Sequence, residues 1–373
     1  MDLGLSDEQA LLAQTVTRAV ENEASISVIR GLLNDPRGID LKFWRRIADV
    51  GCMGLLVSEL HGGSEENGGG LVNAALVCEV MGGIPQPGPL AMTMLVAQAI
   101  DSAGSLPEHS ELLADLLSGD AIATWAIAER GNWDPAAIAL QATATASGFE
   151  LRGEKSAVQD SGIADYILVT ARLDGAFADF LVPNGAAGLV QTPLASLDLT
   201  RRFGHLTLDG VRLPKSSIVG EPRQSPAMWV DRLDQAVILQ CAESVGSAAR
   251  AFDMALEYSK DRISFGRPIG SYQAIKHRLA DMKLLLEACL ATAAGAARDF
   301  GQGAAPTALA SSAKIYIAES CTSIVQSALQ IHGGIGFTWE HDIHLYLRRV
   351  KTNEFVLGSP EWHRGRVCAA LHG

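Results

Sequence analysis

The stretch RISFGRPIGSYQAIKHRLADM, residues 262–282, interrupts two long helical patterns and therefore decides how the C-terminal part of the chain folds. Before it, apolar residues recur at spacings of three and four in AVILQCAESVGSAARAFDMALEYSKDR, and after it they do so again up to residue 300. A third stretch of the same kind covers residues 307–334. Long helices in such close succession are typical of a helical bundle, which we predict for residues 226–373.

The pattern changes on the N-terminal side of this bundle. Between residues 120 and 225, short runs such as DYILVTARL and HLTLDGVRL alternate with a period of two, and Gly, Asn and Asp separate them. This pattern predicts a small antiparallel β domain. Residues 1–119 return to spacings of three and four, and Ser6 with Asp7 marks the start of the first helix. The expected fold is mainly α with a central β domain.

Composition and charge exclude several classes of protein. A chain of 373 residues with 48% hydrophobic residues can bury a large core. Its net charge of −12 and its lack of a Lys/Arg cluster argue against binding to nucleic acid. No apolar run reaches the ~20 residues of a membrane span, and the first residues lack a secretory pattern, so we expect a cytoplasmic protein. The 6 cysteines are scattered without a CxxC pair, which indicates buried free thiols.

Two local motifs carry the candidate chemistry. In the first motif, residues 262–273, a guanidinium (Arg262), a hydroxyl (Ser264) and an aromatic face (Phe265) lie close enough to hold a phosphate-bearing aromatic cofactor. In the second motif, QIHGGIGFTWE at residues 330–340, three glycines let the backbone approach a ligand closely. Taken singly, each motif has an ordinary alternative, because a glycine-rich break between helices is usually a turn.

Together, and in this order, the patterns RxxFGxPIxxxQ and QxxGGxGxxxE resemble the acyl-CoA dehydrogenase family, and the resemblance covers essentially the whole chain. It implies an N-terminal helical domain, a middle antiparallel β domain and a C-terminal four-helix bundle, at residues 1–119, 120–225 and 226–373. It also implies FAD bound between the subunits of a tetramer. Carried over by position, the residues expected at the FAD are Arg262, Ser264, Phe265, Gln273, Gln330, His332, Gly333 and Gly334.

The β domain matches the family less well. Relatives place a tryptophan and a threonine beside the flavin, whereas spacing puts Ala157 and Gln159 at these positions here. We still expect the backbone around Ile127 and Ala128 to reach the flavin.

The catalytic base is missing from its usual position. The family uses the glutamate of a Tyr-Glu-Gly-Thr segment to remove the substrate α-proton, and the match here is VLGS, which puts Leu357 at that position. Some relatives carry the base on the first bundle helix, where this chain has Ala236. Glu243 lies seven residues further on, about 10 Å along the helix, and is the candidate base; its alternative is a structural ion pair. The peptide N–H of Leu357 is still available to hold a thioester oxygen.

A metal site is the alternative interpretation of WEHDIH, residues 339–344, since His341 and His344 lie at helical spacing with two carboxylates. The stretch belongs to the family motif, whose members hold no metal there, so we predict no metal.

The resemblance implies flavin-dependent α,β-dehydrogenation of an acyl-CoA thioester, with electrons passed to an electron-transfer flavoprotein. A first alternative is a catalytically silent FAD-binding subunit that assembles with a paralogous subunit into a heterotetramer. A second alternative is a CoA-thioester-binding protein without a redox role, against which the intact first and second motifs argue. The acyl group is not identified by the sequence.

Overall fold

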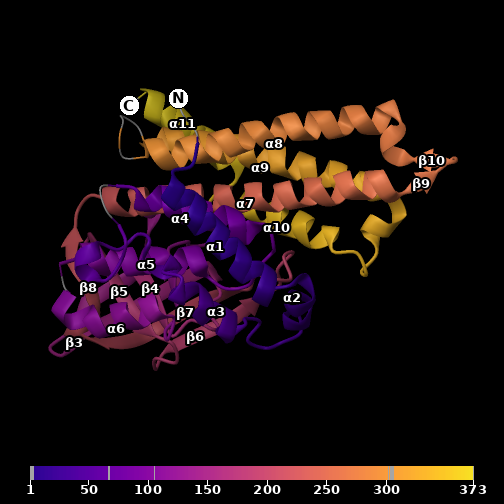
Figure 1. Cartoon of the computed structure of the whole chain (residues 1–373). Helices are drawn as coiled ribbons and strands as arrows, with labels where there is room; N and C mark the ends of the chain where they lie inside the picture. The colour runs from indigo at the N-terminus through magenta and orange to yellow at the C-terminus, as the bar shows by residue number, and fades with distance from the viewer. Residues whose placement is uncertain (1–3, 66–67, 105, 301, 303–305, 373) are drawn as a thin grey trace.

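The computed structural model describes residues 4–65, 68–104, 106–300, 302 and 306–372, and its N-terminal part consists of helices (Figure 1). Ser6 starts the first helix with a capping box, in which it and Gln9 bond reciprocally to each other's backbone N–H. Asp40 caps the third helix in a similar way, accepting from two backbone N–H groups. The helices are α1 (Asp7–Glu23), α2 (Ile26–Leu32), α3 (Leu41–Asp49), α4 (Gly70–Gly82), α5 (Leu90–Ser102) and α6 (Leu106–Ser118).

A single large sheet follows, with the order β6-β7-β3-β2-β4-β5-β8 and with β1 beside β4. The sheet is mixed rather than antiparallel throughout, because β1 and β2 both pair with β4 in parallel. The expectation of an antiparallel domain was therefore wrong for β1 and β2, because a period of two reports alternating side-chain faces, which parallel and antiparallel strands share. The strands are β1 (Ala123–Ala126), β2 (Gln141–Ala144), β3 (Gly148–Gln159), β4 (Tyr166–Leu173), β5 (Ala176–Pro183), β6 (Leu189–Leu194), β7 (Phe203–Pro214) and β8 (Ile218–Arg223).

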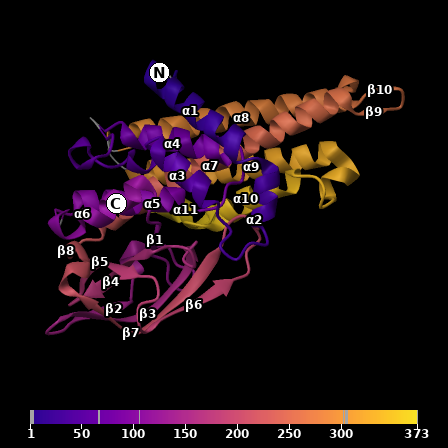
Figure 2. The same ribbon diagram turned by 60° about the horizontal axis from the view of Figure 1, so that its bottom comes forward.

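Long helices form the C-terminal part, as the spacing predicts. The bundle consists of α7 (Ala227–Asp261), α8 (Gln273–Asp299), α9 (Pro306–His332), α10 (Ile343–Phe355) and α11 (Pro360–His372). At the far end of α7 and α8 the chain turns through a short hairpin of β9 (Ile263–Ser264) and β10 (Arg267–Pro268). Figures 1 and 2 show this hairpin projecting beyond the body of the molecule.

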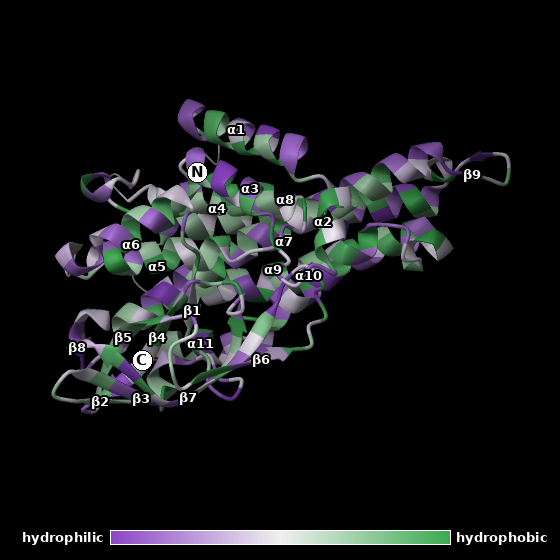
Figure 3. Cartoon of the chain, turned by 90° about the horizontal axis from the view of Figure 1, so that it is seen from below, coloured by the Kyte–Doolittle hydropathy of each residue, from purple (hydrophilic) through white to green (hydrophobic). Residues whose placement is uncertain are grey.

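The N-terminal helices pack directly on the bundle through a close crossing of α4 and α7. A Cβ atom added at Gly82 would meet the backbone O of Glu243 at 2.0 Å, and one at Gly246 would meet the backbone O of Glu79 at 1.8 Å. Only glycine permits this approach. One buried apolar cluster runs through all three parts of the chain. In Figure 3 hydrophobic residues prevail on the central helices, whereas hydrophilic residues are prominent on α1 at the edge.

The cysteines are free thiols, and all but one of them are buried. Cys368 near the end of α11 is exposed, whereas Cys52, Cys78, Cys241, Cys289 and Cys321 are buried free thiols, as expected. Within the described ranges, no helix has both the length and the apolar character required to cross a membrane.

Candidate active site

The first motif forms the projecting hairpin between α7 and α8. Arg262 is the C-cap that follows α7, and its carbonyl accepts from the N–H of Ile269 at 2.8 Å. The hydroxyl of Tyr272 donates to the carbonyl of Ser264 at 3.0 Å and so pins the hairpin to the start of α8. Phe265 occupies the tip with a φ of 53° and is 95% exposed. The motif therefore presents an aromatic ring and a guanidinium to the outside of this chain.

The second motif lies at the same end of the bundle. Its His332 ends α9 and stacks on Tyr258 of α7, with ring centroids 4.6 Å apart. Since Tyr258 lies one turn before Arg262, this stack links the two motifs. A Cβ atom added at Gly333 or at Gly334 would meet nothing within 4 Å. The space over these two glycines is therefore open. Gly333 has a left-handed φ of 63°, which favours glycine, whereas neither packing nor a positive φ requires glycine at Gly334.

The donors of both motifs fit a diphosphate. The guanidinium of Arg262 forms no ion pair with any residue in the described part of the chain, and Gln273, Gln330 and Gly334 are exposed. A guanidinium, amide groups and peptide N–H groups near glycine are donors that proteins use for phosphate oxygens. Direct contact of these residues with a cofactor stays a prediction.

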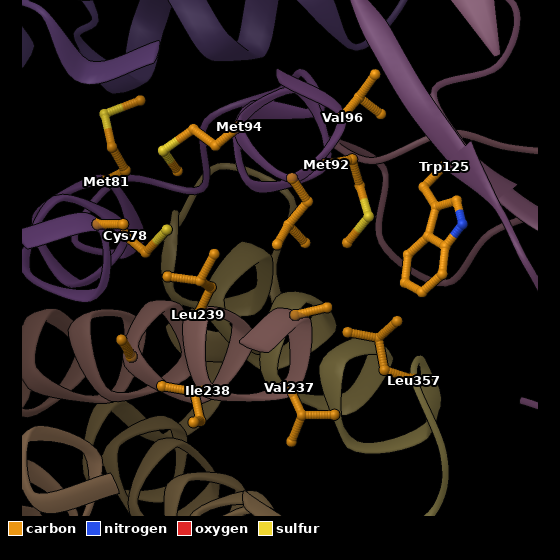
Figure 4. Packing of buried hydrophobic residues seen from close by; sticks show 14 of the residues in the cluster. Cys78, Met81, Met92, Met94, Val96, Trp125, Val237, Ile238, Leu239 and Leu357 are labelled. Carbon is orange, nitrogen blue, oxygen red and sulfur yellow. The ribbon is translucent and has the colours of Figure 1, made fainter. Parts of the chain in front are cut away.

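The turn that contains Leu357 connects α10 to α11. Leu357 is 2% exposed and has a left-handed φ of 63°, which costs a residue with a Cβ about 1–2 kcal/mol. Figure 4 shows its side chain within the buried apolar cluster, on the side of Trp125 of β1 and Val237 of α7. The carbonyl of Leu357 accepts from Nε2 of His363 at 3.0 Å. Its peptide N–H makes no hydrogen bond with any described residue.

Glu243 is the centre of a buried ionic network. Its Oε1 accepts from Arg201 Nη2 at 2.6 Å and from Arg349 Nη1 at 2.6 Å, and its Oε2 accepts from Asn353 Nδ2 at 3.0 Å. Burial by itself would raise the pKa of Glu243, but the two guanidinium groups outweigh burial and lower the pKa to about 2. Arg349 also pairs with the buried Asp198. A carboxylate held in this way is a weak proton acceptor, so the geometry favours the structural alternative that the sequence left open.

A cavity separates α7 from the N-terminal helices, beside this network. With its opening to solvent included, its volume is about 690 Å³. Ala236 and Glu243 both line it, so the two positions considered for a base on α7 face one space. Most other lining side chains are apolar, and the polar lining residues besides Glu243 are Asp40, Gln86, Gln159, Arg201 and Gln240.

Of the β-domain residues predicted near a flavin, Ala157 lies at a β-bulge, whereas Gln159 pairs with Phe203 in the ladder of β3 and β7. The register shifts between Lys155 and Val158, and Ala157 has a φ of 51°. The peptide N–H of Ser156 donates to the carbonyl of Ala128 at 2.8 Å, which brings the predicted strand segments together.

The residues of the alternative metal site are engaged in other contacts. Asp342 accepts from Arg30 at 2.6 Å, and the ring of His341 lies 4.4 Å from that of His332. His344 stacks on Trp339 at 5.0 Å. The described ranges contain no group of three or more His, Cys, Asp or Glu residues arranged to hold a metal ion.

Two buried lysines near the site were missed by sequence reasoning. Lys155 donates to the carbonyl of Ile127 at 3.2 Å and to Glu129 Oε1 at 2.7 Å. Lys314 of α9 donates to the carbonyl of Val356 at 2.9 Å, and also to the Gln240 side chain and the Asn353 carbonyl. Burial lowers the pKa of each lysine to about 8. The available signal was a lone lysine within an apolar run, as in SSAKIYIA, but nothing in the sequence names its partners.

Comparison with known proteins identifies relatives over the whole chain. The model of the acyl-CoA dehydrogenase N-terminal domain matches residues 6–120, and that of the C-terminal domain matches residues 227–372. The acyl-CoA dehydrogenase IpdE2 of Mycolicibacterium smegmatis is 31% identical over 374 residues, which cover 98% of this chain and 100% of the relative. The ChsE4-ChsE5 complex of Mycobacterium tuberculosis matches with a TM-score of 0.86 and 27% identity, over 100% of this chain and 99% of the other. A variant of the Tcur3481-Tcur3483 steroid ACAD matches with a TM-score of 0.85 and 29% identity, over 99% and 98%.

Proposed function

The chain belongs to the acyl-CoA dehydrogenase family, and from this premise we propose that it is the base-deficient subunit of a mixed acyl-CoA dehydrogenase. Enzymes of this family are FAD-dependent oxidoreductases that act on the CH–CH bond of an acyl-CoA thioester. In the proposed assembly, a paralogous subunit carries the carboxylate that removes the α-proton. The electrons then pass to an electron-transfer flavoprotein.

The observation that carries this proposal is the buried leucine at residue 357. Leucine has no group that accepts a proton, and general-base catalysis contributes about 10²–10⁴-fold to the rate of such a step. The position on α7 where other relatives carry a base is Ala236, and the nearby Glu243 is bound to two guanidinium groups. This chain therefore supplies no free carboxylate at either family position.

The donor set of the two motifs fits FAD. Arg262 would meet its pyrophosphate, with Ser264 and Phe265 beside it and Gln273, at the start of α8, close to the same cofactor. Gln330 and the backbone at His332–Gly334 would contact the adenosine and pyrophosphate portion of a cofactor bound mainly by a neighbouring subunit. FAD, when bound, supplies the acceptor for the hydride from the substrate β-carbon. The chain's own contribution is to bind and orient the cofactor and the thioester. Because the hairpin projects away from the body, we infer that it completes a site on another subunit (Figure 2).

The names of two related structures support a mixed assembly. Each of them, the ChsE4-ChsE5 complex and the Tcur3481-Tcur3483 steroid ACAD, consists of two differently named proteins. Both match almost the whole of this chain at 27% and 29% identity.

The test is to purify the chain alone and together with a paralogous subunit that has Glu at the position of Leu357. Each sample is titrated without oxygen with a panel of acyl-CoA thioesters, and the visible flavin spectrum is recorded. We expect bleaching by at least one thioester in the mixed assembly and none in the chain alone. Bleaching of the chain alone at a comparable rate would overturn the proposal. Absence of flavin from both samples would favour thioester binding without redox chemistry.

A second candidate function is a self-sufficient dehydrogenase with Glu243 as its base. The observation in its favour is that Glu243 lines the same cavity as Ala236. In that case the chain alone bleaches, and Glu243→Gln abolishes bleaching while flavin stays bound.

A further inference from the structure

Two side chains from different helices hold the turn around Leu357. Lys314 of α9 donates to the carbonyl of Val356 at 2.9 Å, and His363 of α11 donates through Nε2 to the carbonyl of Leu357 at 3.0 Å. The two carbonyls are consecutive, so the plane of each peptide group in the turn is fixed by a separate helix. Residue 357 would otherwise have to keep its left-handed backbone unaided.

The ammonium group of Lys314 is buried without an ionic partner among the residues that the structure describes. Its side chain is 2% exposed, and its ammonium group bonds to a carboxamide and two backbone carbonyls rather than to a carboxylate. Burial of an ammonium group without an ionic partner is expensive, and a neutral side chain would fill the same space without that cost. Its acceptors belong to α7, to the end of α10 and to the turn, so the charge ties the turn to the wall of the cavity through Gln240.

His363 is oriented for its role by a second bond. Because a carbonyl oxygen only accepts, Nε2 carries the proton, and Nδ1 accepts from the hydroxyl of Ser311 at 3.0 Å. Burial and the neighbouring Lys314 lower the pKa of His363 to about 3, so the ring stays neutral in this tautomer. The ring therefore donates one hydrogen bond to the turn, and the bond to Ser311 fixes its orientation.

In the held turn, the peptide N–H groups of the buried residues Leu357 and Gly358 have no hydrogen-bond acceptor among the described residues. Buried peptide N–H groups are almost always paired in proteins, so these donors indicate an acceptor supplied by a ligand. We propose that Lys314 and His363 are positioning residues that hold the Leu357 N–H as a donor for the carbonyl oxygen of a bound CoA thioester. This inference rests on the proposed function, because it takes the thioester site of the family to lie at this turn.

The test compares a thioester with the matching thioether, in which a CH₂ group replaces the carbonyl. Both are titrated into the flavin-loaded mixed assembly, and binding is read from the change in flavin absorbance. In Lys314→Met the Leu357 N–H is no longer held in place, so its hydrogen bond to the thioester oxygen is lost and thioester binding should weaken about three- to tenfold. The thioether has no carbonyl oxygen, so its binding should stay the same. Lys283→Met, which alters an exposed lysine of α8, is the matched control and is expected to change neither.

A second pair of variants keeps the inference testable if Lys314→Met does not fold. His363→Leu removes the donor to the Leu357 carbonyl, whereas His363→Gln retains an N–H donor at the end of its side chain. We expect His363→Leu to weaken binding of the thioester but not of the thioether, and His363→Gln to restore thioester binding. Equal weakening of thioester and thioether, or no weakening of either, would overturn the positioning role. If the unaltered assembly binds neither compound, the proposed function itself fails, which is a separate and recognisable outcome.

Discussion

Arg349 of α10 and Glu243 of α7 form a buried ion pair, with 2.6 Å between Nη1 and Oε1. The pair joins two residues that are 106 positions apart in the chain and lie on different helices. Arg201 from the segment between β6 and β7 binds the same carboxylate oxygen, so one side chain connects the bundle to the β domain. Glu243 thus contributes to the packing of the whole molecule, and this explains why its charge is kept next to a largely apolar cavity.

Glu243→Gln should destabilise the fold. The substitution removes the negative charge that pairs with the buried guanidinium groups of Arg201 and Arg349. Removal of one partner of a buried ion pair costs about 3–5 kcal/mol. Urea unfolding at neutral pH measures the loss. Glu361→Gln, at a side chain that is 87% exposed, should change the free energy of unfolding by less than about 0.5 kcal/mol. Similar values for the two variants would contradict the role of Glu243 as an ionic centre.

The same carboxylate predicts a loss of stability in acid. The pKa of Glu243 falls from 4.5 to about 2 on folding, so the unfolded chain binds the proton more strongly. Its contribution is therefore fully present above about pH 5 and is lost as pH falls toward 2, roughly 3 kcal/mol in all. Unfolding free energies between pH 6 and 3 should fall less steeply in Glu243→Gln than in the unaltered chain. Parallel curves would argue against the lowered pKa.

Lys314 predicts the opposite dependence at alkaline pH. Its pKa is lowered from 10.5 to about 8 in the folded chain, so the unfolded chain binds more protons between these values. Stability that the buried charge removes at pH 7 is therefore recovered as pH rises from 8 toward 10.5. The difference in unfolding free energy between the unaltered chain and Lys314→Met should shift in favour of the unaltered chain over this range. A constant difference would show that the ammonium group is not destabilised by burial.

Leu357→Glu should restore a base in a turn whose backbone is already held. We expect the chain to bleach flavin with an acyl-CoA thioester when it carries this substitution, provided that flavin is bound. Leu357→Gln, which has nearly the same shape but no proton-accepting carboxylate, is the matched control. The position is buried, so burial raises the pKa of the new carboxyl group and bleaching should increase with pH. Equal behaviour of the two variants would indicate that residue 357 does not face the substrate.

The close crossing of α4 and α7 predicts that alanine has opposite effects on stability at two glycines. In Gly246→Ala the new Cβ meets the backbone O of Glu79 at 1.8 Å, which forces the helices apart and should cost about 1–3 kcal/mol. In Gly295→Ala on α8 the new Cβ meets nothing within 4 Å, and the helix should gain about 0.5–1 kcal/mol. Thermal unfolding of the two variants distinguishes a packing role from general intolerance to substitution.

The sequence was informative where a feature depends on local spacing. The period of the apolar residues predicted the long helices, and Ser6 with Asp7 predicted the start of the first helix. The direction of β1 and β2 could not be predicted from the sequence, because it depends on the distant strand with which each of them pairs. Nor does spacing reveal that Lys314 reaches the turn at Val356, or that Arg349 pairs with Asp198 across 151 positions. Such contacts arise from the packing of whole elements, and a single sequence carries no record of them.

The projecting hairpin has a consequence for the life of the protein in a cell. Phe265 and Ile263 are 95% and 63% exposed in the free chain, and exposed apolar side chains are what chaperones and proteases recognise. A copy without its assembly partner is then expected to be degraded faster than an assembled copy. In the proposed mixed assembly, the amount of this chain would therefore follow the supply of the paralogous subunit, whatever the rate of its own synthesis. Pulse-chase measurement of its half-life with and without the partner reads this dependence directly.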